Sequence, residues 1–167
     1  MFKTNIQPGL INVSNSFLIL RIKGQVNLPH WVVTTFKLFN MEKKYRATII
    51  PKKDNYIGML NKIKNYACWT DAGMSLVEEL INKRAYKIGN IKFTDSDAVK
   101  SGFNNINHLA RSISDGKTTL SKIKMLKPWF ALSPPKHGFK KSTKKMYSEN
   151  GILGYNKDLG ILIKNMM

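Results

Sequence analysis

The stretch Phe17-Leu18-Ile19-Leu20-Arg21-Ile22 decides the fold of this chain. It is apolar at every position but one and is closed by Gly24, which is typical of a strand buried on both faces near the middle of a sheet. Pro29 then stands where a helix can begin, because proline suits the first helical position. The apolar residues that follow recur at helical spacing: Val32, Val33, Phe36 and Phe39. A buried strand followed by a helix therefore opens the core.

A second strand and a second helix follow. Residues 46–50 are rich in β-branched side chains and are stopped by Pro51, so they predict a short strand. Residues 52–55 are a polar turn, and a helix is predicted from about residue 56 to 67. Its apolar stripe consists of Met59, Leu60, Ile63, Tyr66 and Ala67.

The middle of the chain has the pattern of helices. Thr94-Asp95-Ser96-Asp97 opens one of them with a capping-box pattern, in which Thr94 and Asp97 bond each other's backbone N–H groups. The next helix is ended by Gly116 and carries Ile106, Leu109, Ala110 and Ile113 on one face. Residues 129–132 then predict a strand, and Leu159, Leu162 and Ile163 predict a short C-terminal helix.

The charge of the chain is extreme for its size. Its 167 residues carry 28 Lys+Arg against 10 Asp+Glu, a net charge of +18. With 43% hydrophobic residues the chain is too apolar for a disordered tail, and at this length one domain is the default. A lone domain of this charge repels itself, so a polyanionic partner is expected, nucleic acid before an anionic membrane surface.

The positive charge is unevenly placed. Residues 1–66 and 116–167 each have a net charge of +9, whereas residues 67–115 are neutral. Residues 116–148 hold nine lysines and no acid, which favours phosphate neutralisation over an ordinary solvated face. Only four of the cations are arginines, which favours recognition of the phosphate backbone over base reading.

The sequence carries no motif for catalysis, a metal or a cofactor. Cys68 is the only cysteine, which excludes a disulfide within the chain and a cysteine zinc site and predicts a small buried apolar group. His30, His108 and His137 lack metal-ligand spacing. Neither a signal peptide nor an apolar run of transmembrane length is recognised. We therefore expect no enzyme activity, no cofactor, no small-molecule substrate and no membrane partner.

Aromatic residues offer candidates for stacking on RNA bases. Trp31, Trp69, Trp129 and Tyr147 could each stack on a base, and Trp31 and Tyr147 are the better candidates. Trp69 and Trp129 lie beside apolar runs, so core packing is expected for both.

Several short segments, none specific alone, occur in a specific order over about residues 17–155. They are Leu20-Arg21-Ile22-Lys23-Gly24 with residues 27–31, Tyr45-Arg46-Ala47 leading to Ile50-Pro51, Tyr56-Ile57-Gly58-Met59-Leu60 with Tyr66 and Trp69, Leu80-Ile81-Asn82-Lys83-Arg84, Thr94-Asp95, residues 132–141 and residues 151–155. In this order they resemble the L-thirty family of large-ribosomal-subunit proteins, in its longer archaeal and eukaryotic form, whose eukaryotic member is called L-seven.

Three features depart from the pattern of the family. Ile57 stands where the family usually has arginine, so one expected phosphate contact is absent. Pro135-Lys136-His137-Gly138 replaces the usual Pro-Arg-Gly-Gly loop, and Lys136 cannot make a bidentate phosphate contact. About 16 residues precede the first strand, in place of the long basic extension of eukaryotic members, which favours an archaeal ribosome and leaves a reduced eukaryote open.

The resemblance implies an α+β fold with a β-α-β-α-β core, related to ferredoxin-like small sheets, and a mainly helical insertion between the second helix and the third strand. The expected divisions are an N-terminal segment (1–16), an α/β core (17–67 and 126–133), the insertion (68–125) and a basic loop and C-terminal extension (134–167). Much of residues 136–150 is expected to be disordered without RNA.

The resemblance also implies a structural, non-catalytic role in the cytoplasmic large ribosomal subunit. The expected partners are large-subunit rRNA, near or including 5S rRNA, and neighbouring ribosomal proteins. The candidate RNA-binding residues are Arg21, Lys23, His30, Trp31, Arg46, Lys52, Lys53, Lys62, Lys136, His137, Lys140, Lys141, Lys144, Lys145 and Tyr147. The two basic flanks, residues 1–66 and 116–167, are expected to form one continuous surface that binds folded RNA. The neutral residues 67–115 are expected to face away from that RNA. The alternatives are an RNA-acting enzyme or an RNA chaperone outside the ribosome, and a DNA-architectural or membrane-surface protein.

Overall fold

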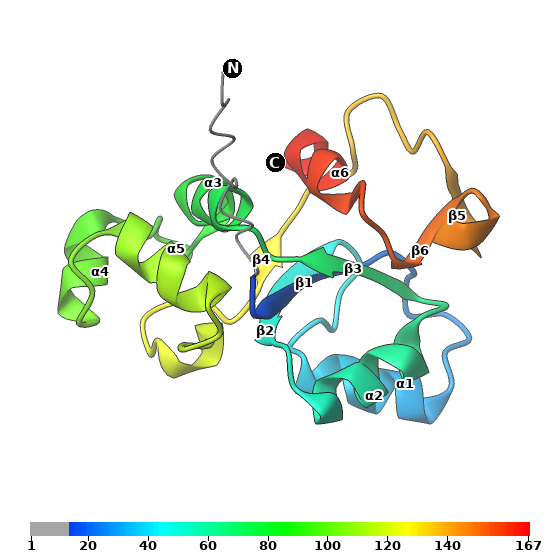
Figure 1. Ribbon diagram of the computed structural model, residues 1–167, viewed down its shortest axis with the longest axis horizontal. Coiled ribbons are helices and arrows are strands. Elements are labelled where there is room, and N and C mark those ends of the chain that lie inside the picture. Colours follow the sequence, from blue (N-terminus) through cyan, green and yellow to red (C-terminus); the bar gives the residue numbers. More distant parts are fainter. Residues whose placement is uncertain (1–13) are drawn as a thin grey trace, which may run out of the picture.

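The computed structural model describes residues 14–167 (Figure 1). The predicted N-terminal segment therefore lies almost wholly outside the described residues. Within them, one mixed sheet contains β1 (Ser16–Arg21), β2 (Arg46–Pro51), β3 (Ala67–Asp71), β4 (Phe130–Ala131), β5 (Ser142–Met146) and β6 (Gly151–Tyr155). The strand order is β4-β2-β1-β3-β6-β5, so β1 lies inside the sheet, as its apolar run predicts. β1 is antiparallel to β2 and β3, and β6 is parallel to β3.

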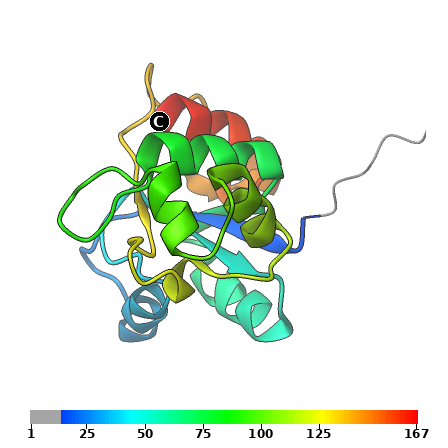
Figure 2. The same ribbon diagram turned by 90° about the vertical axis from the view of Figure 1, so that its left-hand side faces the viewer.

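Helices cover both faces of this sheet. Figures 1 and 2 show α1 (His30–Leu38) and α2 (Asp54–Ile63) on one side, and α3 (Met74–Arg84) with α6 (Leu159–Met166) on the other. The alternation of side chains along β1 serves both layers: Leu18 and Leu20 enter the core on the α3 side, and Ile19 enters the core on the α1 side. A strand between two helical layers must be apolar on both faces, which explains the unbroken run at 17–20.

The second helix and third strand differ from the prediction. The helix ends at Ile63, and Ala67–Asp71 form β3. The helix was predicted to extend to residue 67 because Tyr66 and Ala67 continue its apolar pattern. Both residues do pack into the same apolar cluster as Leu60 and Ile63, but Tyr66 lies in a turn and Ala67 in a strand. The β-α-β-α-β core is therefore complete at Asp71, and the boundary predicted after residue 67 falls within its third strand.

The helical insertion follows that third strand. It contains α3, α4 (Asp95–Lys100) and α5 (Ile106–Ser114), and a single 3-10 turn, η1, at Leu120–Lys122. The predicted capping box is present: Asp97 Oδ2 accepts from the backbone N–H of Thr94 at 3.1 Å and from its hydroxyl at 2.8 Å. Figure 1 shows α4 and α5 at one end of the molecule, away from α1, α2, β5 and β6.

Residues 134–167 contain a strand and a helix that pack against the rest of the fold. β6 pairs with β3, and Leu159, Ile163 and Met166 of α6 are fully buried. The C-terminal helix is confirmed. The expected disorder of 136–150 does not hold for Ser142–Met146 and Tyr147–Glu149, which form β5 and the 3-10 turn η2, because Phe139 and Met146 pack on the core and hold this segment in place.

Candidate nucleic-acid interface

The carboxyl end of β1 brings the two basic flanks together. The backbone N–H groups of Ile22 and Lys23 donate to the carbonyl oxygen of Tyr66, and Lys23 Nζ lies 5.2 Å from the centre of the Tyr66 ring. Nearby, Lys44 Nζ lies 4.6 Å from the centre of the Tyr45 ring. That ring packs on Phe139 with 6.2 Å between ring centres. The Tyr45–Phe139 contact therefore joins the first basic flank to the 134–141 loop of the second.

The adjacent edge of the sheet adds two more cations. Arg46 pairs with Ala131 across β2 and β4, and its guanidinium carbon lies 3.9 Å from the centre of the Trp129 ring. Lys127 Nζ lies 5.3 Å from the same ring. Trp129 is only half-buried, so its expected role in the core is wrong, and the indole instead supports two positive charges at the surface.

We define the sheet-end surface as Lys23, Lys44, Arg46, Lys127, Lys136 and Lys140. None of these side chains forms an ion pair within residues 14–167. Among the described residues, the cations that form ion pairs are Lys52, Lys87, Lys117, Lys141 and Lys164. The sheet-end surface is therefore a concentration of positive charge that the described acids do not neutralise.

Lys52 and Lys53 lie at the opposite end of the sheet. In the register of β1 and β2, Ser16 faces Pro51, whereas Leu20 faces Ala47. Lys52 and Lys23 therefore leave opposite ends of a six-residue strand, about 20 Å apart at strand rise. Lys52 also binds Asp71 at 2.7 Å. The prediction that the basic flanks meet on one surface is therefore wrong for Lys52 and Lys53, because the sequence does not show the relative direction of β1 and β2.

Arg21 lies inside the protein. Its side chain is buried and donates to four backbone carbonyls: those of Lys23, Gly24, Met41 and Glu42. Its guanidinium carbon lies 4.3 Å from the centre of the Phe36 ring. Burial lowers the pKa of Arg21, and the nearby Arg46 adds to this effect. The guanidinium thus connects the 23–24 and 41–42 loops to β1. Arg21 was predicted to contact RNA, but its side chain has this structural role instead.

The 136–141 loop faces α6 across a groove of about 470 Å³. Lys136 and Lys140 are exposed, and His137 is exposed in a left-handed conformation. Lys141 instead bonds Asp158 at 2.9 Å and lies over the Tyr147 ring, whose hydroxyl donates to the same carboxylate. These hydrogen bonds, from Lys141 first and Tyr147 second, lower the pKa of Asp158. Lys141 and Tyr147 are thus engaged within the protein.

Lys144 and Lys145 are exposed on β5, the outermost strand of the sheet. Edge strands commonly carry lysines, which discourage pairing with other chains. Their position is equally compatible with phosphate contact.

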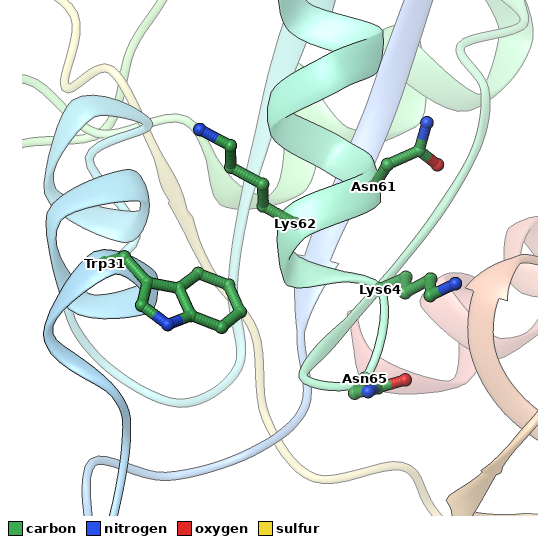
Figure 3. A pocket seen from close by; sticks show the side chains of 5 residues that line it. All are labelled: Trp31, Asn61, Lys62, Lys64 and Asn65. Atoms are coloured by element: carbon green, nitrogen blue, oxygen red, sulfur yellow. The ribbon is translucent and has the colours of Figure 1, made fainter.

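Trp31 and Lys62 share a second groove, of about 450 Å³ (Figure 3). Trp31 extends from α1 toward α2, and Lys62 extends from α2 back toward α1. Asn61, Lys64 and Asn65 complete the lining. His30 precedes Trp31 at the start of α1 and is exposed.

Three cations that the sequence did not single out contribute to these surfaces, Lys44, Lys64 and Lys127, together with Trp129, which was expected in the core. A basic residue next to an aromatic one, as in Lys44-Tyr45 and Lys127-Pro128-Trp129, was the signal available. Among residues 14–167 no group of three metal-ligating side chains is found, and no helix is long and apolar enough to cross a membrane. Cys68 is fully buried, as predicted, and burial raises the pKa of its thiol.

Comparison with known proteins agrees with this architecture. The family model for ribosomal protein L30p/L7e matches residues 17–67, which span β1 to the start of β3. The chain is 49% identical to the large ribosomal subunit protein uL30 of Nitrosopumilus maritimus (strain SCM1) over 93% of this chain and 100% of the relative. It is 46% identical to that of Cenarchaeum symbiosum (strain A), over the same shares, and 36% identical to that of Staphylothermus marinus, over 90% and 98%. The chain therefore belongs to the ribosomal protein L30p/L7e family.

Proposed function

We propose that this chain is a structural constituent of the large ribosomal subunit that binds and stabilises folded rRNA through lysine–phosphate contacts. Its contact surface includes the sheet-end surface, and the neighbourhood of 5S rRNA is its proposed place. Its further partners are neighbouring ribosomal proteins. The family consists of structural ribosomal proteins, so the chain is not an enzyme.

The observation that carries this proposal is the meeting of both basic flanks at one end of the sheet. Cations from the 23, 44–46, 127 and 136–140 segments gather there around Tyr45, Phe139 and Trp129. In the free protein these charges repel one another, and closely spaced phosphates of a folded RNA would relieve that repulsion. The neutral helices α4 and α5 lie at the other end of the molecule, where a neighbouring protein or solvent is compatible with their charge (Figure 1).

The proposal is tested by the affinity of the purified protein for large-subunit rRNA fragments over a series of salt concentrations. Each phosphate contact releases condensed counterions, so the logarithm of the affinity should fall steeply and linearly with the logarithm of salt concentration. A flat dependence would reject lysine–phosphate binding as the basis of affinity.

The place of the protein on the rRNA requires a separate measurement. Lysine-directed crosslinking on intact large subunits should connect Lys23, Lys44 and Lys136 to rRNA, with crosslinks close to 5S rRNA. Crosslinks to distant rRNA alone would remove 5S rRNA from the proposal while leaving rRNA binding intact.

A further inference from the structure

Trp31 is unusual among the aromatic side chains described. It is 50% exposed, and no cation or second ring lies against it within residues 14–167. Other rings next to basic residues are already occupied: Tyr66 by Lys23, Tyr45 by Lys44 and Phe139, and Trp129 by Arg46 and Lys127. The indole of Trp31 therefore has a face available to an external partner.

The surface of the groove around this indole is mostly apolar, and one cation, Lys62, extends across it toward the ring (Figure 3). Its volume of about 450 Å³ lies within the range of small-ligand sites, roughly 300–1,000 Å³. Lys62 supplies a positive charge on the side of α2 that faces the indole, whereas Asn61, Lys64 and Asn65 line the margin with side chains that extend away from it in Figure 3. None of these four side chains has a hydrogen-bond or ion-pair partner of its own among residues 14–167. An aromatic plane and an adjacent cation are the groups that recognise a base and its phosphate, respectively.

We infer that the Trp31 groove holds an unpaired nucleotide of the bound RNA, with its base stacked on the indole and its phosphate beside Lys62. This inference rests on the proposed rRNA binding and gives that function a second, chemically different contact. The sheet-end surface binds backbone charge, whereas the Trp31 groove selects a base that has left its helix.

The geometry requires that base to be unpaired. Bases within an RNA duplex are stacked on their neighbours and expose only their edges, so they offer no face to an indole. Figure 3 shows the indole extending from α1 toward α2, beside the groove of about 450 Å³. Bulged and loop nucleotides expose their faces, and stacking of this kind tolerates any base because each has a π face.

The test compares two RNA hairpins that differ only in one bulged nucleotide. The wild-type protein should bind the bulged hairpin more tightly, and Trp31→Ala should weaken that binding roughly 5- to 100-fold while changing the affinity for the paired hairpin little. Trp31→Phe should keep part of the preference. Because Trp31 is half exposed, neither substitution is expected to unfold the chain.

Tryptophan fluorescence gives an independent readout. Binding of the bulged hairpin should quench the emission of the wild-type protein more than binding of the paired hairpin does, and Trp31→Phe should remove that difference although Trp69 and Trp129 remain. Leu38→Ala is the matched control, because Leu38 is an exposed apolar residue of the same helix and does not line the groove. Its preference for the bulged hairpin should equal that of the wild type.

The outcomes separate the inference from the proposed function. If Trp31→Ala leaves the preference for the bulged hairpin unchanged while affinity still falls steeply with salt, the groove does not hold a base and rRNA binding stands. The same result would follow if the groove were a protein contact. If affinity for both hairpins is independent of salt, the proposed function itself fails.

Discussion

Arg21 is the one basic side chain of residues 14–167 that is almost completely buried, at 2% exposure. Four backbone carbonyls accept its hydrogen bonds, and two of them belong to Met41 and Glu42, which connect α1 to β2. The Arg21 side chain thus holds two loops in place by hydrogen bonds, and its charge is not part of the protein surface. This role also explains how one charged residue can stand in an otherwise apolar core strand.

Arg21→Met should destabilise the fold far more than it weakens RNA binding. Methionine fills part of the space but leaves buried carbonyls without donors, at an expected cost of about 2–4 kcal/mol in the free energy of unfolding. Urea denaturation measures that cost, and binding to an rRNA fragment is measured at a temperature where the variant is folded. A folded variant with strongly weakened RNA binding would instead make Arg21 an RNA contact.

Asp97 makes the stability of the fold depend on pH in the acid range. Hydrogen bonds from Lys87 first and from Thr94 second lower the pKa of Asp97 to about 2. The carboxylate is thus favoured in the folded state, and its contribution is fully present above the unfolded pKa near 4. As pH falls from about 4 to about 2 the group becomes protonated and that contribution is lost.

Asp97→Asn therefore should be less stable than the wild type at neutral pH, and the difference should shrink through this pH range. Circular dichroism during urea denaturation at a series of pH values measures both curves. Asp95→Asn provides a neighbouring control within the same helical turn. A difference between wild type and Asp97→Asn that stays constant down to pH 2 would show that the ion pair with Lys87 does not stabilise the fold.

At the scale of elements, the sequence predicts best the strands and helices whose pattern is complete in one segment. β1, α1 and β2 were predicted because one continuous run or one helical stripe defines each. β3 was missed because its first residues continued the stripe of α2. β6 was not predicted as a strand because it contains Gly151 and Gly154, and the reason for these glycines is visible only when β5 lies beside them.

Gly151→Ala tests how closely β5 and β6 approach. A Cβ at this position would lie 1.9 Å from the carbonyl oxygen of Lys145, so the backbone of one segment must move. We expect a loss of about 2 kcal/mol or more in the free energy of unfolding, measured by urea denaturation. Unchanged stability would mean that the two segments are not packed this tightly.

Gly58→Ala is the matched control for that substitution. Gly58 lies within α2, and a Cβ there would meet no atom within 4 Å. Alanine favours the helix over glycine, so this variant should be more stable by about 0.5–1 kcal/mol. Opposite signs for the two substitutions would separate the steric effect at Gly151 from the general effect of replacing glycine.

For the whole molecule, the sequence predicts that charge is segregated but not where it gathers. The net charges of the three segments follow from counting, and the topology then places α4 and α5 at one end and the sheet-end surface elsewhere. Ion pairs such as Lys52–Asp71 and Lys141–Asp158 join residues distant in sequence, so no local pattern indicates which lysines are neutralised. The same limit applies to Trp129, whose two cations come from β2 and a loop.

Two double variants with equal loss of charge test whether position or total charge governs RNA binding. Lys23→Gln/Lys44→Gln changes the sheet-end surface, whereas Lys100→Gln/Arg111→Gln changes exposed residues of α4 and α5. If the two lysines contact phosphates, the first variant should reduce the magnitude of the log affinity–log salt slope by about two. The second should leave that slope almost unchanged, because charges beyond about 10 Å of solvent at 0.1 M salt are screened. Equal reductions in both would mean that the protein binds RNA through its overall charge, and the distinct role of the sheet-end surface would then be rejected.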